Sequence, residues 1–428
     1  MALSAPREAL NRAASANGQA NRWVIAAAGV VIQIVLGALY AWSVFRIPLT
    51  KTFGWTISQV TLTFTIANFV LGFAGFVGGI WMRKSGPRRV AIASGILYGA
   101  GVFLASFSGG HLYWLYFSYG FLGGIGLGLG YIVPVATLVK WFPDKRGVIT
   151  GIAVAGFGAG ALITAPVATS LIRDVGVLKT FAVLGIVSFI TVTGAALFIK
   201  DPPHGFVPAG WKPSAAQTKE RTARDYTFGE ALEKWQWYAL WAMMFLNTLA
   251  GISIISQAAA MAQEITQVTA AVAAGMVGII AIANGSGRVL WSWLSDAIGR
   301  RAVFFSMFLI QAAVFALMPH VTGFGLFTTL AFIVLLCCGG GFGTMPAFTA
   351  DYFGATHVGS IYGLMLTAWG FAAVLGPMLF ASIRQNTGHY SQALYVISVI
   401  VLASAVLPLI TRPPTSETRD QITTPRAA

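Results

Sequence analysis

The sequence predicts an all-α integral membrane protein with twelve transmembrane helices arranged as two six-helix halves. The first observation is composition: 57% of the 428 residues are hydrophobic and only 9% are charged, too few charges to cover a soluble protein of this size. The second is a succession of twelve long apolar segments. The third is a set of short motifs that recur half a chain apart. Soluble enzymes, secreted scaffolds and disordered chains are therefore poor interpretations.

Each apolar segment holds about 18 or more residues, enough for a helix to cross a hydrocarbon layer of about 30 Å. A helix satisfies its own backbone hydrogen bonds in lipid, and the alternation typical of a β-barrel is absent. The segments 52–82 and 321–350 could each contain an interfacial turn. The predicted segments are 23–45, 52–82, 90–110, 112–139, 148–172, 180–199, 235–263, 265–295, 302–319, 321–350, 358–383 and 390–411.

The basic residues predict the orientation in the membrane. With the N-terminus inside, five of the 27 Lys and Arg residues fall in outside loops and one falls within a helix, which leaves 21 on the cytoplasmic side. This bias predicts a multi-pass protein of the cytoplasmic membrane with both termini in the cytoplasm. It also accounts for the net charge of +14 without nucleic acid as a partner. The five outside residues are Arg46, Lys51, Arg173, Lys179 and Arg384.

An internal repeat and one long polar stretch divide the chain. Gly86 aligns with Gly299 at an offset of 213, and Gly147, Gly151 and Gly158 align with Gly359, Gly363 and Gly370 at an offset of 212. Duplicated halves are typical of transporters that move about a site at the middle of the membrane. The predicted parts are a cytoplasmic N-terminal tail (1–22), a first six-helix half (23–199), a cytoplasmic linker (200–234), a second half (235–411) and a cytoplasmic C-terminal tail (412–428).

The loop between the predicted eighth and ninth helices carries Leu294, Asp296, Gly299, Arg300 and Arg301. In this it resembles the signature Gly-x-Leu-x-Asp-x-x-Gly-Arg-Arg of the major facilitator superfamily, which implies the major facilitator fold. The first-half copy keeps Gly86 but has Arg83 where the aspartate is expected. The resemblance implies a cytoplasmic gate at these two loops, and the departure at Arg83 implies that the gate depends mainly on the second copy.

Further motifs resemble the oxalate/formate antiporter family, which is similar to the monocarboxylate transporters. The resemblance covers about residues 22–411 and implies a secondary active transporter of small carboxylate anions rather than an enzyme. The motifs are Ile34–Phe45, Phe53–Gly54–Trp55, Lys140–Gly147, Ile255–Ala258 and Leu366–Gly370.

Arg288 is the one basic residue within a predicted helix. It lies eight residues before Asp296, which is about 12 Å along a helix. A charge at that depth costs about 2.5–3.5 kcal/mol even on permissive scales, and no Asp or Glu lies deep in any predicted helix. We expect Arg288 to bind the substrate anion, because a guanidinium can hold a carboxylate through two parallel hydrogen bonds. The resemblance implies the same role, and an arginine that reaches back to the interface is the alternative.

Several polar and aromatic residues are further candidates for the substrate site. Asn284 lies one turn before Arg288, where it could orient the guanidinium, bind substrate or join two helices. Gln33 and Tyr40 share a face of the first helix, and Asn247 and Gln257 lie in the seventh. The resemblance implies that Tyr40, Tyr131 and Trp369 wall the cavity; packing or an interfacial anchor is the alternative for each of these three aromatic residues.

One departure from the oxalate transporters concerns the eleventh helix, where those proteins carry a lysine that gives a second positive charge. Residues 358–383 contain no Lys or Arg, and Ala372 lies one turn after Trp369. Since a dianion would keep one carboxylate uncompensated, we expect a monocarboxylate such as formate or lactate. The alternatives are an oxalate/formate-type dicarboxylate exchanger and, less favoured, an anion channel.

Coupling to anion exchange or to proton symport stays open from the sequence. We expect a monomer in the lipid bilayer, with no cofactor, no metal site and no catalytic residues, because the five histidines lie near loops and Cys337 and Cys338 lie in an apolar run.

Overall fold

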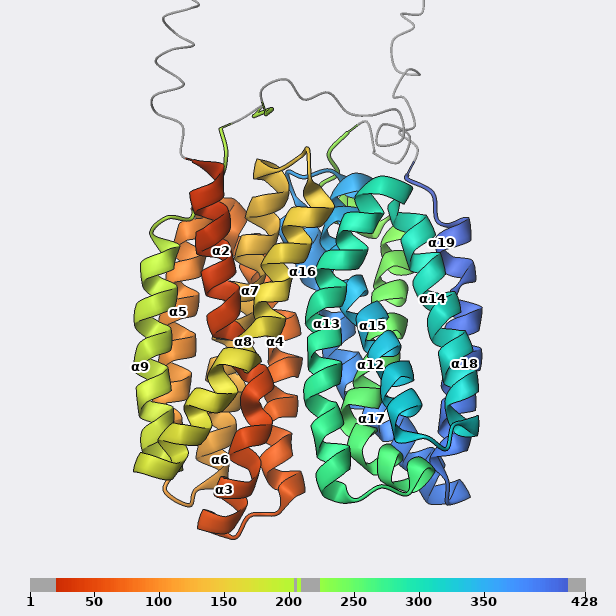
Figure 1. Cartoon of the computed structure of the whole chain (residues 1–428). Helices are drawn as coiled ribbons and strands as arrows, with labels where there is room; N and C mark the ends of the chain where they lie inside the picture. The colour runs from red at the N-terminus through yellow and green to blue at the C-terminus, as the bar shows by residue number, and fades with distance from the viewer. Residues whose placement is uncertain (1–20, 204–205, 209–223, 415–428) are drawn as a thin grey trace, which may run out of the picture.

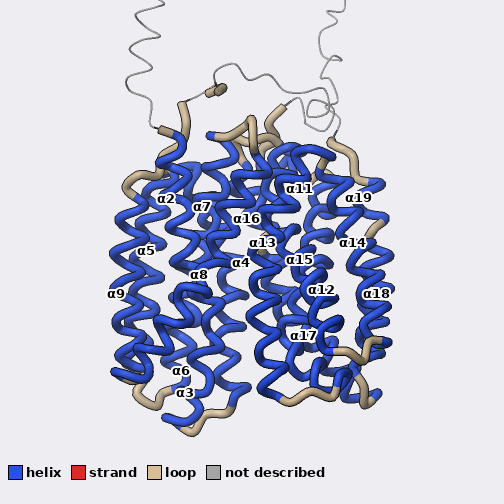
Figure 2. The backbone as a smooth tube through the Cα atoms, viewed as in Figure 1, coloured by secondary structure: helices blue, strands red, loops and turns tan. Residues whose placement is uncertain are grey.

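Every regular element in the described part of the chain is a helix (Figure 2). The computed structural model describes residues 21–203, 206–208 and 224–414. The predicted tails, 1–22 and 412–428, and the central part of the predicted linker lie largely outside these residues.

The first group of helices covers residues 22–196. Its first span is composed of three pieces and its fourth span of three, whereas the others are nearly continuous. The elements are α2 (Arg22–Leu36), η1 (Gly37–Trp42), α3 (Ser43–Phe53), α4 (Ile57–Ser85), α5 (Pro87–Leu104), η2 (Ala105–Phe107), α6 (Leu112–Leu115), η3 (Tyr116–Leu122), α7 (Gly123–Trp141), α8 (Arg146–Val175) and α9 (Val177–Ala196).

The second group follows a short helix in the linker, α11 (Phe228–Leu232). The last two spans of this group are each divided, one at Leu366 and the other at Ala405. The elements are α12 (Trp235–Thr266), α13 (Ala270–Ile298), α14 (Arg300–Leu317), η4 (Met318–His320), α15 (Phe324–Phe353), α16 (Val358–Met365), α17 (Thr367–Thr387), α18 (Tyr390–Ser404) and α19 (Val406–Ile410).

Eleven helical spans in the described residues are long and apolar enough to cross a membrane. The helix α13, which carries Arg288, is a further helix of 29 residues. These spans confirm the predicted all-helical membrane class. The largest difference from the predicted boundaries is at the first span, which continues through η1 and α3 to Phe53 instead of ending at residue 45.

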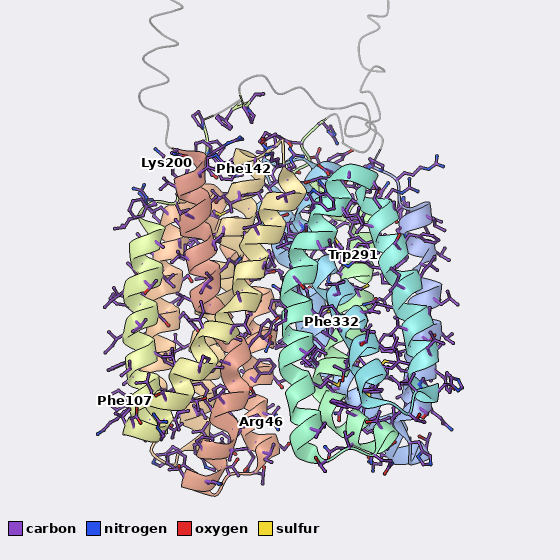
Figure 3. All side chains as sticks on the ribbon, viewed as in Figure 1. Arg46, Phe107, Phe142, Lys200, Trp291 and Phe332 are labelled. Carbon is purple, nitrogen blue, oxygen red and sulfur yellow. The ribbon has the colours of Figure 1, made fainter. Side chains whose placement is uncertain are left out.

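The two groups stand side by side with both described chain ends on one face (Figure 1). We call this the terminal face, since the linker also connects the groups there, and we call the other the opposite face. Phe142 and Lys200 lie at the terminal face and Arg46 and Phe107 at the opposite face (Figure 3). Large apolar side chains such as Ile163, Val167 and Ile190 are exposed on the outside of the bundle, as lipid contact requires.

The repeat predicted from sequence recurs in the backbone. Gly86 has φ +80° and ψ 162°, and Gly299 has φ +93° and ψ 153°. Each ends one helix and begins the next with a positive φ that favours glycine. The aligned residues therefore form the same sharp connection in both groups, between α4 and α5 and between α13 and α14.

Candidate functional site

Arg288 is fully buried between the two groups of helices. Its Nη1 donates to the backbone carbonyl of Val154 in α8 at 2.8 Å, and its Nη2 donates to Oδ1 of Asn284 at 3.1 Å. Its Nε has no hydrogen-bond partner among the described residues. The guanidinium thus joins helices of both groups and keeps donors for a further acceptor, since five N–H groups are available on an arginine.

Five aromatic rings surround this charge. The guanidinium carbon lies 5.1 Å from the ring centre of Phe342 and 6.0 Å from that of Phe157, within the range of cation–π attraction. The Trp369 ring lies 5.0 Å from Phe342, 5.8 Å from Phe157 and 5.7 Å from Tyr131, and Tyr40 lies 5.1 Å from Phe157. We define the Arg288 cluster as Arg288, Asn284, Tyr40, Tyr131, Phe157, Phe342 and Trp369.

The helix breaks help to position the cluster. Tyr40 lies on the 3₁₀ segment η1, and its hydroxyl is close enough to interact with the guanidinium. Trp369 lies three residues after the break at Leu366 between α16 and α17. Departures from α-helical geometry change the direction of the following side chains and often mark functional positions.

The structure brings most of the predicted site residues together. Gln33 is buried against the cluster and donates to the carbonyl of Tyr131 at 3.2 Å. Asn247 is buried beside α15 and donates to the carbonyl of Cys338 at 3.1 Å.

Gln257 lies elsewhere. It accepts a hydrogen bond from the Tyr390 hydroxyl at 3.0 Å, and Tyr390 in turn bonds Glu264 through its backbone. The residue therefore belongs to the polar end of α12 near the opposite face, several turns from the cluster.

Sequence reasoning missed Phe157 and Phe342, although the repeat contained a signal for both. The offset of 212 that aligns Gly158 with Gly370 also aligns Phe157 with Trp369. Tyr131 and Phe342 stand 211 residues apart, the offset that also aligns Trp141–Phe142 with Tyr352–Phe353. The aromatic wall is thus built from two repeated pairs, whereas Arg288 aligns with Gly75 at an offset of 213 and occurs in one copy.

At the terminal face a network of charges joins the groups. Asp296 accepts from the backbone N–H groups of Gly147 at 3.1 Å and Val148 at 2.9 Å, which satisfies two donors at the start of α8. Arg300 pairs with Asp296 at 2.6 Å and with Asp351 at 3.1 Å.

Asp351 also pairs with Arg146 of the first group at 2.8 Å, so the network reaches across the boundary twice. Gly147 makes the approach possible, because a β-carbon there would overlap the carbonyl of Ser292. Sequence reasoning missed Arg146 and Asp351.

The other predicted gate residues lie at the same face in different roles. Arg301 donates to the carbonyls of Pro408 and Leu409, which ties α14 to α19 within one group. Gly299 and Gly86 form the helix connections described above. Burial, and next the nearby Arg83, lowers the pKa of the His357 imidazole.

The cluster combines one buried cation, unused N–H donors and an aromatic wall between two similar groups of helices. An arrangement of this kind can hold an anion at the boundary between the two groups. Together with the charged closure at one face, it defines the protein class as a membrane transporter.

Comparisons with known proteins agree with this class. The family model for the Major Facilitator Superfamily matches residues 23–255 and 240–426, and the chain belongs to that superfamily.

Named relatives cover most of the chain. It is 31% identical over 84% of its length to the Escherichia coli protein called "Uncharacterized MFS-type transporter YhjX", of which it covers 87%. It is 28% identical over 92% of its length to the oxalate:formate antiporter of Oxalobacter formigenes, of which it covers 93%. The fold is similar to that of the transporter FucP in the outward conformation, with a TM-score of 0.69 at 16% identity over 91% of this chain and 99% of that one.

Proposed function

We propose that this protein transports small carboxylate anions, with monocarboxylates such as formate or lactate as substrates, by alternating access of its two halves. The carrying observation is Arg288, a buried guanidinium with an unpaired Nε at the boundary between the groups. A carboxylate that meets Nε and the neighbouring Nη2 would gain two charge-assisted hydrogen bonds. Similarity to an oxalate:formate antiporter supports the same substrate class.

The preference for one carboxylate rests on the charge of the cluster. Arg288 is its single basic residue, and Ala372, one turn after Trp369, is buried and apolar. A second carboxylate bound among Phe157, Phe342 and Trp369 would lack a cationic partner. Burial of an uncompensated charge is expensive, so a monoanion fits this site better than a dianion.

Exchange of oxalate for formate is the second candidate, and the antiporter relative favours it. In such a protein the second carboxylate would be bound by hydroxyl and indole donors instead of a lysine. An anion channel is less favoured, because a channel does not require two halves that close over a buried site. Coupling to a counter-anion and coupling to a proton are both consistent with the cluster.

The proposed orientation places the terminal face in the cytoplasm, in accord with the excess of basic residues there. The halves that rock would be residues 23–199 and 235–411, with the network of Asp296, Arg300 and Asp351 as the cytoplasmic gate. The protein would act as a monomer in the cytoplasmic membrane.

The direct test is transport by the purified full chain in proteoliposomes. Labelled formate, lactate and oxalate are offered with and without unlabelled anion inside, and with and without a pH gradient. We expect saturable counterflow of a monocarboxylate that Arg288→Gln abolishes. The matched control is Arg173→Gln, which removes an exposed arginine that pairs with Asp174 at the opposite face.

Full transport by Arg288→Gln would refute the role of the arginine. Stronger binding of oxalate than of formate and lactate would refute the argument from a single charge and favour the dicarboxylate exchanger. Uptake that neither saturates nor shows counterflow would favour the channel.

A further inference from the structure

At two aligned positions the copies of the repeated gate carry opposite charges. In the second copy Asp296 and Asp351 are carboxylates. Their aligned positions in the first copy are Arg83, at the offset of 213, and Lys140, at the offset of 211. The first copy thus has two bases where the second has two acids, and it cannot close by the same bonds.

The beginning of the linker supplies a carboxylate for one of these bases. Asp201 binds Lys140 through both of its oxygens at 3.1 Å. The neighbouring Trp141 donates its indole N–H to the carbonyl of Lys200 at 2.8 Å, and its ring packs on Phe206 with the ring centres 4.9 Å apart. This end of the linker is therefore attached to the end of α7.

The far end of the linker is attached to the repeated counterpart of that segment. Tyr226 binds at Phe353, which aligns with Phe142: its backbone N–H donates to the Phe353 carbonyl at 2.9 Å and the two rings lie 5.9 Å apart. Asp225 accepts a hydrogen bond from the Thr356 hydroxyl. It also packs directly against Gly354, where a β-carbon would overlap its carboxylate.

Asp225 lies at the loop before α16, the helix whose start is aligned with that of α8. The start of α8 is held by Asp296 of the second copy. At the loop before α16, His357 lies within electrostatic range of Arg83 and Lys140 from the first half and of Asp225 and Glu230 from the linker. Bases of the first copy and acids of the linker thus act on the same imidazole.

The short helix α11 follows Asp225 and Tyr226 and connects this end of the linker to the first half. It begins with a capping box in which Thr227 and Glu230 bond each other's backbone N–H groups, which fixes its direction. Its first residue, Phe228, packs on Phe76 of α4 with the ring centres 5.2 Å apart. One described segment, 224–232, therefore contacts both halves at the terminal face.

We propose that the linker is a working part of the gate: Asp201 and Asp225, at its two ends, supply the carboxylates that the first copy lacks at positions 83 and 140. Asp225 and Phe228 act as positioning residues that hold the loop 354–357 against the first half when the terminal face is closed. This role goes beyond carboxylate transport and does not depend on which anion is carried.

The test measures access to the closed face. Ser360 is 3% exposed at the start of α16, so Ser360→Cys gives a reporter thiol that a water-soluble maleimide reaches when this face opens. Mass spectrometry of the labelled full chain distinguishes this reporter thiol from the buried Cys337 and Cys338. No carboxylate is added, so the outcome is separate from that of the transport assay.

We expect Asp225→Asn to raise the labelling rate about threefold, a modest change because the bond to Thr356 is at the surface. Phe228→Ala should raise it in the same direction. The matched control is Glu233→Gln, an exposed acid directly after the segment 224–232, which should leave the rate unchanged. Arg83→Asp, introduced into Asp225→Asn, should return the rate toward that of the parent, because it restores the acid found at the aligned Asp296.

Equal labelling of the Asp225→Asn and Glu233→Gln proteins would overturn the proposal. Failure of Arg83→Asp to reduce the rate in the Asp225→Asn background would overturn the claim that the linker acid replaces the missing one.

Discussion

Asn284→Asp is the sharpest test of the Arg288 cluster, because it replaces one amide nitrogen with oxygen and leaves the arginine in place. Oδ1 of Asn284 lies 3.1 Å from Nη2 of Arg288. A carboxylate at that distance attracts the guanidinium by about 5 kcal/mol at an effective dielectric constant of about 20. The new side chain would therefore neutralise the charge that we propose binds the substrate.

The expected loss follows from the bonds that the substrate would no longer form. A hydrogen bond to a charged group contributes about 1.5–3 kcal/mol, and a loss of about 2 kcal/mol corresponds to about a 30-fold rise in KM. The assay is counterflow of labelled formate and lactate in proteoliposomes, with rates measured across a range of concentrations.

The control is Gln311→Glu, which places a carboxyl in a buried part of α14 where the amide bonds Val334. It should keep KM within about twofold when rates are normalised to folded protein. An Asn284→Asp protein with unchanged KM for both anions would refute the assignment of Arg288 as the anion-binding charge.

Three further predictions address the cluster and the gate. Phe342→Leu removes a ring that lies 5.1 Å from the guanidinium carbon; loss of about 1 kcal/mol of cation–π attraction should change KM about fivefold, whereas an unchanged KM would show that the ring only fills space. Asp296→Asn weakens the cap on α8 and the pair with Arg300, and should raise maleimide labelling of the Ser360→Cys reporter at least as much as Asp225→Asn does; labelling at the parent rate would exclude Asp296 from the closure. Burial, then Arg83, lowers the pKa of His357 below its usual value near 6.5. The neutral imidazole therefore stabilises the closed loop above pH 6.5, and this contribution is lost as the pH falls below 6.5 toward the lowered pKa. Labelling of the same reporter thiol should rise over that range, and it should become independent of pH in His357→Gln; the same rise in that variant would assign the effect to another group.

The membrane class, the helix order and the position of Arg288 could be predicted because each depends on local sequence. A run of about 20 apolar residues forms a spanning helix wherever it occurs, and a lone arginine within it is conspicuous. The end of the first span was harder to predict. The helix continues through η1 (Gly37–Trp42) into α3, whereas the sequence pattern predicts that it ends at residue 45.

The partners of Arg288 on other helices could not be predicted in the same way. Asn284 is four residues away on the same helix, so its contact follows from helical spacing. Phe157 and Phe342 come from α8 and α15, and their approach depends on how whole helices pack. Gln257 lies away from the cluster for the same reason, since the rotation and depth of α12 decide which residues face the centre.

The bond between Arg288 and the carbonyl of Val154 has a consequence for comparing relatives. A backbone carbonyl remains available as an acceptor when the side chain of its residue is substituted. A sequence alignment can therefore reveal the arginine, but it cannot reveal the carbonyl that accepts its hydrogen bond. Relatives with a different residue at this position of α8 could keep the same hydrogen bond from the arginine to the backbone carbonyl, provided that the register of the helix is the same. An alignment would not show this hydrogen bond. For this protein, the shape of a backbone would be as much an inherited part of the proposed anion recognition as any side chain.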